Sequence, residues 1–153
     1  MLHFKSLNEP SISEWLELFN DQKVKKHMPL ADFSVDEDWI QSWIAKKLDS
    51  SKETPFEISS IWVEDKFAGW GGIQADGENF EVAIVLRPQY WGFGLEIYCN
   101  YINEYKNSGL ANPLLVYLPL TRKIDGIKKR LNFIELPNIQ ISGIEFQVLK
   151  VCN

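Results

Sequence analysis

One segment in the middle of the chain constrains the fold more than any other: an apolar run that passes through a glycine-containing turn into a helical pattern. The run is Phe80 to Leu86, the glycines are Gly92 and Gly94, and apolar residues at helical spacing continue to Tyr105. We expect the glycines to allow positive φ and to leave room for a closely approaching ligand. The first N–H groups of a helix have no partner inside it, so the segment predicts an anion site suited to phosphate or pyrophosphate. The alternative is a plain tight turn.

Two common phosphate-binding motifs do not fit this segment. No Lys-Ser or Lys-Thr pair follows the glycines, which excludes a P-loop. A dinucleotide-binding fingerprint would need a third glycine where the chain has Ile97, and it would need a parallel βαβ frame. The runs before the segment instead predict antiparallel hairpins, with an Asp76-Gly77 turn between two of them.

The remaining elements follow from the period of the apolar residues. Two helices are expected to open on Ser-x-x-Glu capping boxes, at Ser11–Glu14 and at Ser34–Glu37, with a connection over 23–33. The expected strands are 2–7, 56–63, 67–74, 80–86, 114–118, 133–141 and 145–151, and the expected helices are 11–19, 34–48, 91–107 and a short one near 124–131. This order predicts an α+β fold: a mostly antiparallel, twisted, mixed sheet of about six or seven strands flanked by about four helices.

Length and composition narrow the class of protein. The 153 residues are expected to form one domain spanning 1–153, since nothing in them reads as a boundary. A net charge of -5 argues against a nucleic-acid binder or an anionic-membrane binder. No run approaches the roughly 20 apolar residues of a membrane span, and a cytoplasmic location is expected. No His, Cys and carboxylate cluster has metal-ligand spacing, so no metal is expected.

The segment also resembles a known family. Gln89-x-x-Gly92-x-Gly94 matches the Gln/Arg-x-x-Gly-x-Gly/Ala signature of the GNAT superfamily of N-acetyltransferases. The longer stretch from Glu81 to Gly94 is similar to the branch that acetylates the N-termini of ribosomal proteins. Lys129-Arg130-Leu131-Asn132-Phe133 is similar to the Lys-Leu-Gly-Phe that ends the last helix of that family, with Asn132 in place of the glycine.

The resemblance implies a site for acetyl-CoA. Backbone groups of Ile84, Val85 and Leu86 would pair with the pantetheine arm like an added strand, beside a cleft formed where this strand splays from the strand at 114–118. An amide N–H near Leu86 would stabilise the tetrahedral oxyanion. The turn and the helix start would hold the pyrophosphate through Gln89, Tyr90, Trp91, Gly92, Phe93, Gly94 and Leu95.

The family position for an Asn that follows this site holds Thr121, whose hydroxyl would contact the cofactor. The family position for a catalytic Tyr holds Lys128, so the acid that would protonate the thiolate is missing from its usual place. A CoA thiolate is a good leaving group that water can reprotonate.

Three side chains are candidates for a role beside the cofactor, Glu81 and His27 because of the resemblance and Trp70 as a possible lining residue, and each has a plainer alternative. Glu81 would be the general base that takes a proton from the amine, or else a surface or ion-paired glutamate. His27 would line the acceptor site, or else be an incidental loop histidine. Trp70 would line the cleft for the substrate, or else belong to the core.

The expected function is therefore transfer of acetyl from acetyl-CoA to a primary amine, on a protein N-terminus or a small molecule, by direct attack. The expected partners are acetyl-CoA and the amine acceptor, with the protein a monomer or homodimer. Two alternatives stay open at this point: a non-catalytic acyl-CoA-binding or regulatory domain that kept the phosphate loop, and an α+β interaction module in which the glycines form only a turn.

Overall fold

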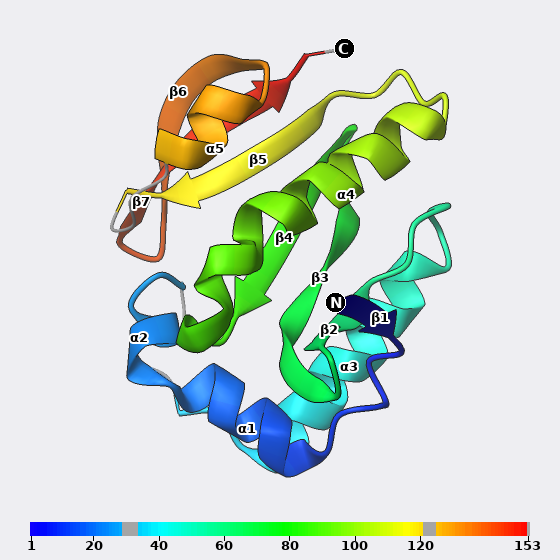
Figure 1. The fold of residues 1–153 in the computed structure, drawn as a ribbon, viewed down its shortest axis with the longest axis vertical. Coiled ribbons are helices and arrows are strands. Elements are labelled where there is room, and N and C mark those ends of the chain that lie inside the picture. Colours follow the sequence, from blue (N-terminus) through cyan, green and yellow to red (C-terminus); the bar gives the residue numbers. More distant parts are fainter. Residues whose placement is uncertain (29–33, 121–124, 153) are drawn as a thin grey trace.

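The computed structural model describes residues 1–28, 34–120 and 125–152. Seven strands, five α-helices and one 3-10 helix follow one another along these residues (Figure 1). Their bounds are β1 (Leu2–Lys5), α1 (Ile12–Asn20), α2 (Gln22–Lys25), α3 (Glu37–Ser51), β2 (Ser59–Val63), β3 (Lys66–Asp76), β4 (Asn79–Leu86), the 3-10 helix η1 (Pro88–Phe93), α4 (Gly94–Asn107), β5 (Leu114–Pro119), α5 (Asp125–Arg130), β6 (Phe133–Ile141) and β7 (Ile144–Val151).

The strands form one sheet in the order β1-β2-β3-β4-β5-β7-β6. Neighbouring strands are antiparallel except for β4 and β5, which run parallel. The predicted α+β fold with a mostly antiparallel mixed sheet is confirmed. No described helix has the length and apolar character needed to cross a membrane.

The N-terminal helices begin at side-chain caps. Ser11 and Glu14 form the predicted capping box of α1, because each side chain accepts a hydrogen bond from the backbone N–H of the other at 3.1 Å. The predicted start of α3 at Ser34 is wrong. Asp36 is the N-cap, with Oδ1 accepting from the Trp39 N–H at 2.8 Å, because its backbone is extended and its carboxylate is a strong acceptor.

A further helix that the sequence pattern did not predict, α2, overlaps the start of the connection expected over 23–33. Asp21 caps the four-residue helix α2 by accepting from the N–H groups of Lys23 and Val24. A single turn is too short to show a 3.6-residue apolar period, which is why the pattern did not reveal it.

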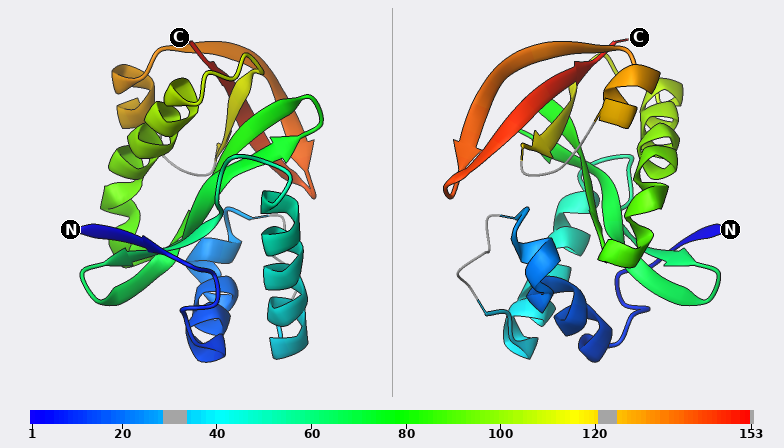
Figure 2. Two further views of the ribbon diagram at one scale, coloured as in Figure 1. Left: turned by 90° about the vertical axis from the view of Figure 1, so that its right-hand side faces the viewer. Right: turned by 60° about the vertical axis from the view of Figure 1, so that its left-hand side comes forward.

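Two apolar clusters lie on opposite faces of the sheet. In Figure 2, left, α4 lies on one side of the ribbon of β3 and β4, and α1 and α3 lie on the other. The α4 cluster includes Ile97 and Val82, and the cluster under α1 and α3 includes Trp15 and Ile40. Strand β4 therefore packs side chains into both clusters, Val82 and Leu86 into one and Ala83 and Val85 into the other.

The strand–turn–helix segment is present, although its glycines do not behave as expected. Between β4 and α4 the chain forms the 3-10 helix η1, and Gly94 has φ of -55°. Neither Gly92 nor Gly94 is among the glycines with positive φ, so that expectation is wrong: a 3-10 turn running into an α-helix needs only negative φ. A Cβ added at either glycine would meet no described atom within 4 Å, which agrees with the expected open space.

Candidate functional site

A cavity of about 370 Å³ lies where β4 and β5 cease to pair. Their parallel pairing covers Phe80–Leu114 to Val82–Val116, and beyond it no described strand pairs with this edge of β4. The structure thus has the gap between the two strands that the resemblance implies. The described lining residues are Val24, His27, Met28, Glu81, Val82, Ala83, Ile84, Val85, Leu86, Trp91, Gly92, Gly94, Leu95, Tyr98, Tyr117, Leu118, Pro119, Gly126 and Phe146.

Most of the residues singled out from the sequence converge on this cavity, and some do not. Glu81, Ile84, Val85, Leu86, Trp91, Gly92, Gly94, Leu95 and His27 line it. Gln89 lines a separate surface hollow beside Asp21, Gln22, Lys23 and Pro88. Tyr90 and Phe93 are partly buried against the α4 cluster and are not among the lining residues described. Thr121 lies outside the described residues.

Trp70 packs in the apolar cluster beneath α1 and α3 and is not among the described residues that line the cavity. Its ring makes a T-shaped contact with the ring of Trp43, with 4.9 Å between the centroids. The packing fits the core alternative for this residue.

The start of α4 differs from the starts of the first three helices. Side chains of Ser11, Asp21 and Asp36 cap α1, α2 and α3. At α4 the N-cap position is Phe93, and no side chain there accepts a hydrogen bond. The Gly94 N–H donates to the Trp91 carbonyl of η1, and the positive end of the α4 dipole lies beside the open space at Gly92 and Gly94, which suits an anionic group.

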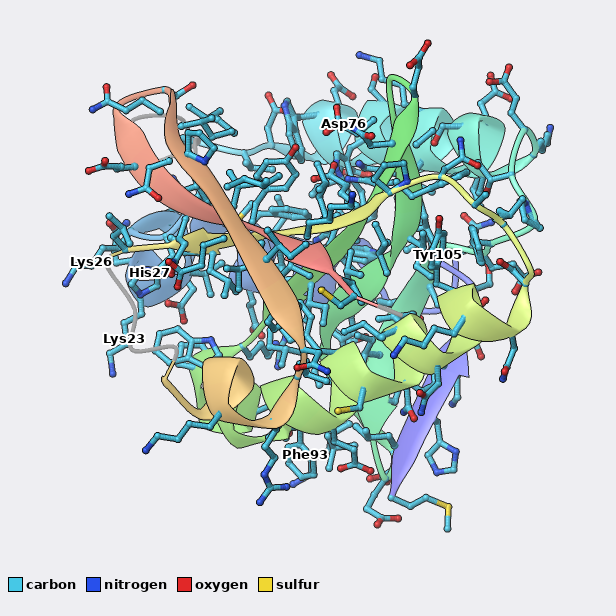
Figure 3. The ribbon with its side chains drawn as sticks, turned by 90° about the horizontal axis from the view of Figure 1, so that it is seen from above. Lys23, Lys26, His27, Asp76, Phe93 and Tyr105 are labelled. Atoms are coloured by element: carbon cyan, nitrogen blue, oxygen red, sulfur yellow. The ribbon has the colours of Figure 1, made fainter. Side chains whose placement is uncertain are left out.

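The turn before α4 is held in place by its own residues. The Trp91 indole Nε1 donates to the Leu86 carbonyl at 2.9 Å, and the Tyr90 N–H donates to the Arg87 carbonyl at 2.9 Å. The His27 ring packs against the Trp91 ring with 5.6 Å between centroids. Figure 3 shows His27 with Lys23 and Lys26 at one side of the molecule, and Phe93 near the start of α4. The segment after α2 thus joins the turn in walling the cavity.

Glu81 is held at the polar end of the cavity, on the part of β4 that still pairs with β5. Its Oε1 accepts a hydrogen bond from Gln74 Nε2 at 2.7 Å. Burial raises the pKa of the Glu81 carboxyl above its usual value, although the Gln74 hydrogen bond and the charge of Lys47 oppose the rise. A carboxylate with a raised pKa inside a cavity is suited to taking up a proton.

Tyr117 is a second polar side chain of the cavity, and the sequence reasoning did not identify it. Its hydroxyl donates to Asp76 Oδ2 at 2.7 Å. Burial, the bond to Asp76 and the charge of Glu81 all raise the pKa of the phenol, so it stays protonated at physiological pH. Tyr117 lies in a short apolar strand with no motif around it that indicates a functional role. The pairing of β3, β4 and β5 brings it close to Asp76 and Glu81.

No group of three or more His, Cys, Asp or Glu residues that could hold a metal ion occurs among the described residues. Cys99 and Cys152 are both free thiols.

Comparison with known proteins connects this geometry to one fold. No protein-family model matches the chain, and no curated protein sequence matches it significantly. Among solved structures, RimL, the ribosomal L7/L12 α-N-protein acetyltransferase in complex with coenzyme A, is 10% identical with a TM-score of 0.78, over 97% of this chain and 92% of that one. The microcin C7 self-immunity acetyltransferase MccE, in complex with acetyl-CoA and AMP, is 19% identical with a TM-score of 0.76, over 99% and 91%.

An N-acetyltransferase from Staphylococcus aureus Mu50 is 12% identical with a TM-score of 0.74, over 99% of this chain and 96% of that one. A mostly antiparallel sheet whose single parallel pair diverges beside an uncapped helix start belongs to the acyl-CoA N-acyltransferase class of folds. Within that class, the chain has the fold of the GNAT acetyltransferases.

Proposed function

We propose that this protein is an N-acetyltransferase that moves the acetyl group of acetyl-CoA to a primary amine. The observation that carries the proposal is the coincidence of three features in one cavity: the unpaired edge of β4, the uncapped start of α4, and the partly buried carboxyl of Glu81. These are the parts needed to hold an extended pantetheine chain, a pyrophosphate and a proton acceptor together.

In this proposal the acyl donor lies along the cavity. The pantetheine arm forms backbone hydrogen bonds with the free edge of β4 at Ile84, Val85 and Leu86. The pyrophosphate lies against the N–H groups at the start of α4, where the missing side chains of Gly92 and Gly94 let it approach the backbone. Solved GNAT-fold structures of RimL with coenzyme A and of MccE with acetyl-CoA support this choice of donor.

The acceptor amine must lose a proton before or during its attack, since an ammonium group has no free electron pair. Glu81 takes that proton, directly or through one water. The neutral amine nitrogen then attacks the thioester carbonyl carbon and a C–N bond forms. The nitrogen gives its next proton to solvent, the C–S bond breaks, and CoA leaves as a thiolate that takes a proton from solvent. A backbone N–H near Leu86 stabilises the intermediate oxyanion.

The acceptor is a protein N-terminus or a small amine, as the resemblance implies. The protein acts as a monomer or homodimer in the cytoplasm. Its net charge of -5 favours encounter with cationic acceptors, since long-range charge steers association.

The test is release of free CoA thiol from acetyl-CoA over a panel of amines that includes peptides with free N-termini, lysine-like amines and aminoglycoside-like polyamines. Glu81→Gln is expected to lower kcat by roughly a hundredfold or more with at least one acceptor. Glu78→Gln, in an exposed turn near the same strand, is the matched control and is expected to keep full turnover. Undiminished turnover in Glu81→Gln would remove Glu81 from the mechanism.

Calorimetric titration with acetyl-CoA distinguishes the remaining possibilities. Binding together with thiol release supports the enzyme. Binding with no thiol release for any amine supports a non-catalytic acyl-CoA-binding domain. No binding at millimolar acetyl-CoA contradicts both and leaves the interaction module.

A further inference from the structure

Three side chains form a series of hydrogen bonds from α3 to the cavity. Lys47 of α3 donates from Nζ to Gln74 Oε1 at 2.7 Å, and Gln74 of β3 donates from Nε2 to Glu81 Oε1 of β4 at 2.7 Å. Residues Gln74 and Glu81 are directly opposite one another in the β3–β4 register, so the second bond is a cross-strand pair. Only Glu81 of the three is among the described residues that line the cavity.

The donor and acceptor groups determine how the Gln74 amide is oriented in this series of hydrogen bonds. A lysine ammonium can only donate, so its partner on Gln74 must be the amide oxygen. With the oxygen directed toward Lys47, the amide nitrogen is directed toward Glu81, where it can only donate to the carboxylate. Lys47 therefore selects one of the two amide orientations of Gln74, and that orientation fixes the carboxylate of Glu81.

The Lys47 ammonium is itself held in a defined place. It lies 5.1 Å from the ring centroid of Trp70 and 5.9 Å from that of Trp43, on the same face of the sheet as α3. Cation–π contact compensates part of the cost of removing a charge from water. Burial lowers the pKa of the Lys47 amine, and the charge of Glu81 opposes that change, so the two groups are electrostatically coupled.

The other charged and titratable groups that act on Glu81 do not oppose its protonation. Asp76 at the end of β3 raises the pKa of Glu81, and Tyr117 of β5 stays neutral at physiological pH. Among the described groups that act on Glu81, the positive charge comes from Lys47.

We propose that Lys47 and Gln74 are positioning residues for the general base: Lys47 orients the Gln74 amide, and the amide holds the Glu81 carboxylate ionised and aimed for proton uptake. The inference rests on the proposed acetyl transfer. Neither residue needs to touch the substrate, and both act through Glu81.

The first test is the pH profile of kcat/KM for the best acceptor found in the amine panel. Lys47→Met keeps an apolar chain over the two tryptophans and removes the cation, so the acid limb is expected to move to higher pH by on the order of one pH unit. Gln74→Leu removes the hydrogen bond and is expected to move the limb in the same direction. Lys47→Arg keeps the charge and is expected to restore most of the wild-type profile.

Lys46→Met is the matched control, because Lys46 is the neighbouring exposed residue on the same helix. It is expected to leave the acid limb in place. A merely structural role for Lys47 would lower activity by the same factor at every pH. Equal acid limbs in Lys47→Met and Lys46→Met would overturn the proposal.

A second measurement does not depend on activity. NMR titration of the Glu81 side-chain carboxyl carbon in the protein without substrate reports its pKa directly. A higher pKa in Lys47→Met and in Gln74→Leu than in wild type supports the positioning role, and unchanged values overturn it. If no amine reacts yet these shifts occur, the proposed function fails while the coupling of Lys47, Gln74 and Glu81 stands.

Discussion

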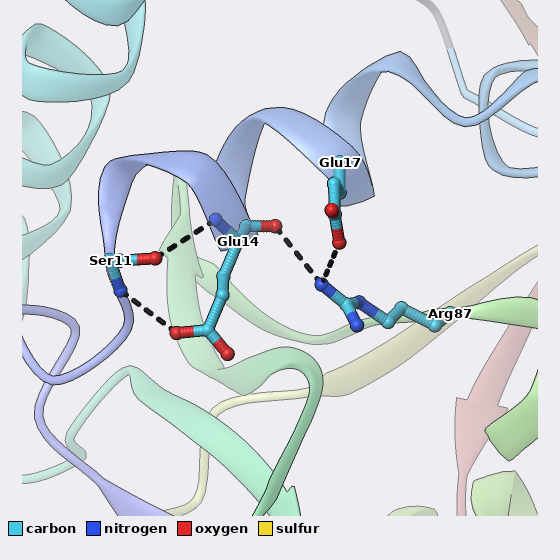
Figure 4. A network of polar contacts seen from close by, with 4 residues as sticks. All are labelled: Ser11, Glu14, Glu17 and Arg87. Carbon is cyan, nitrogen blue, oxygen red and sulfur yellow. Dashed lines mark hydrogen bonds and ion pairs between the residues drawn. The ribbon is translucent and has the colours of Figure 1, made fainter.

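The guanidinium of Arg87 contacts the carboxylate of Glu17, with Nη2 and Oε2 2.9 Å apart, and this ion pair ties helix α1 to the residue that follows strand β4 (Figure 4). The Arg87 guanidinium also lies 5.2 Å from the ring centroid of Phe67. The Arg87 backbone N–H donates to the Ala68 carbonyl at 2.8 Å. These contacts anchor the beginning of the turn that leads to α4, so the N-terminal helix supports the cavity from outside it.

We expect Arg87 and Glu17 to contribute unequally to stability. The Arg87 side chain is 19% exposed and packs on Phe67, while that of Glu17 is 68% exposed. Arg87→Ala loses apolar and cation–π contact and is expected to cost about 1–2 kcal/mol in free energy of unfolding. Glu17→Gln loses only a solvent-screened pair and is expected to cost less than about 1 kcal/mol. Urea unfolding of both variants measures the difference; equal costs would contradict it.

A substitution at Gly69 of β3 is expected to disturb the wall of the cavity, because Gly69 lies opposite Leu86 of β4 in the sheet. The φ of Gly69 is +155°, and a Cβ there would lie 2.0 Å from the Val85 carbonyl oxygen. Gly69→Ala must push β3 away from β4 next to the cavity, and we expect it to cost on the order of 2–3 kcal/mol in free energy of unfolding. Thermal and urea unfolding measure the cost.

Gly94→Ala is the control for Gly69→Ala, because Gly94 has helical φ and open space around it. We expect Gly94→Ala to keep or slightly raise stability, since alanine favours a helix. Its affinity for acetyl-CoA in calorimetry should stay close to that of the wild type, because the Gln/Arg-x-x-Gly-x-Gly/Ala signature that this segment resembles has glycine or alanine at this position. Gly92→Ala, at the position where the signature has glycine, should instead weaken acetyl-CoA binding, and unchanged affinity in that variant would show that nothing approaches the backbone there.

The fold was largely predictable because its signals are local. The Ser11–Glu14 capping box and the period changes along the chain gave the right order of strands and helices, and the run from Phe80 to Gly94 pointed to the cavity. Its glycines supplied space as expected, but not the positive φ. The short helix α2 was missed because a single turn carries no period.

The polar part of the site was only partly predictable, since it is assembled by sheet pairing. Lys47, Gln74 and Tyr117 are far apart in sequence from one another, and each sits in an ordinary amphipathic or apolar pattern. They meet around Glu81 only because β3, β4 and β5 pair in their particular register and α3 covers that face. No local motif encodes that meeting, so a single sequence could suggest Glu81 but not its neighbours.

Replacing Tyr101 with phenylalanine is expected to stabilise the protein. The Tyr101 ring is buried in the α4 cluster, and its hydroxyl has no hydrogen-bond partner among the described residues. Burying an unsatisfied hydroxyl costs free energy, so Tyr101→Phe is expected to stabilise the protein by on the order of 1 kcal/mol. Tyr117→Phe, which breaks the bond to Asp76, is the contrasting variant and should not stabilise. Urea unfolding at neutral pH compares them, and a loss of stability in Tyr101→Phe would reveal a partner for its hydroxyl.

The raised pKa of Glu81 predicts how stability depends on pH. Burial raises the folded-state pKa above that of the unfolded chain, so the folded protein holds the Glu81 proton more tightly. That contribution to stability is fully present below the unfolded pKa and is lost as pH rises through the folded pKa. Glu81→Gln cannot ionise. Wild type should therefore lose stability relative to Glu81→Gln as pH rises from about 4 through the folded pKa, with a constant difference above it.

Thermal unfolding of wild type and Glu81→Gln at a series of pH values from about 4 to 8 measures this difference. Glu78→Gln, in the exposed turn, controls for the general loss of one negative charge. A wild type that instead gains stability over Glu81→Gln as pH rises would mean that the Lys47 charge and the Gln74 hydrogen bond outweigh burial. The folded pKa of Glu81 would then lie below its unfolded value, and the carboxylate would be a weaker base than the proposed proton transfer requires.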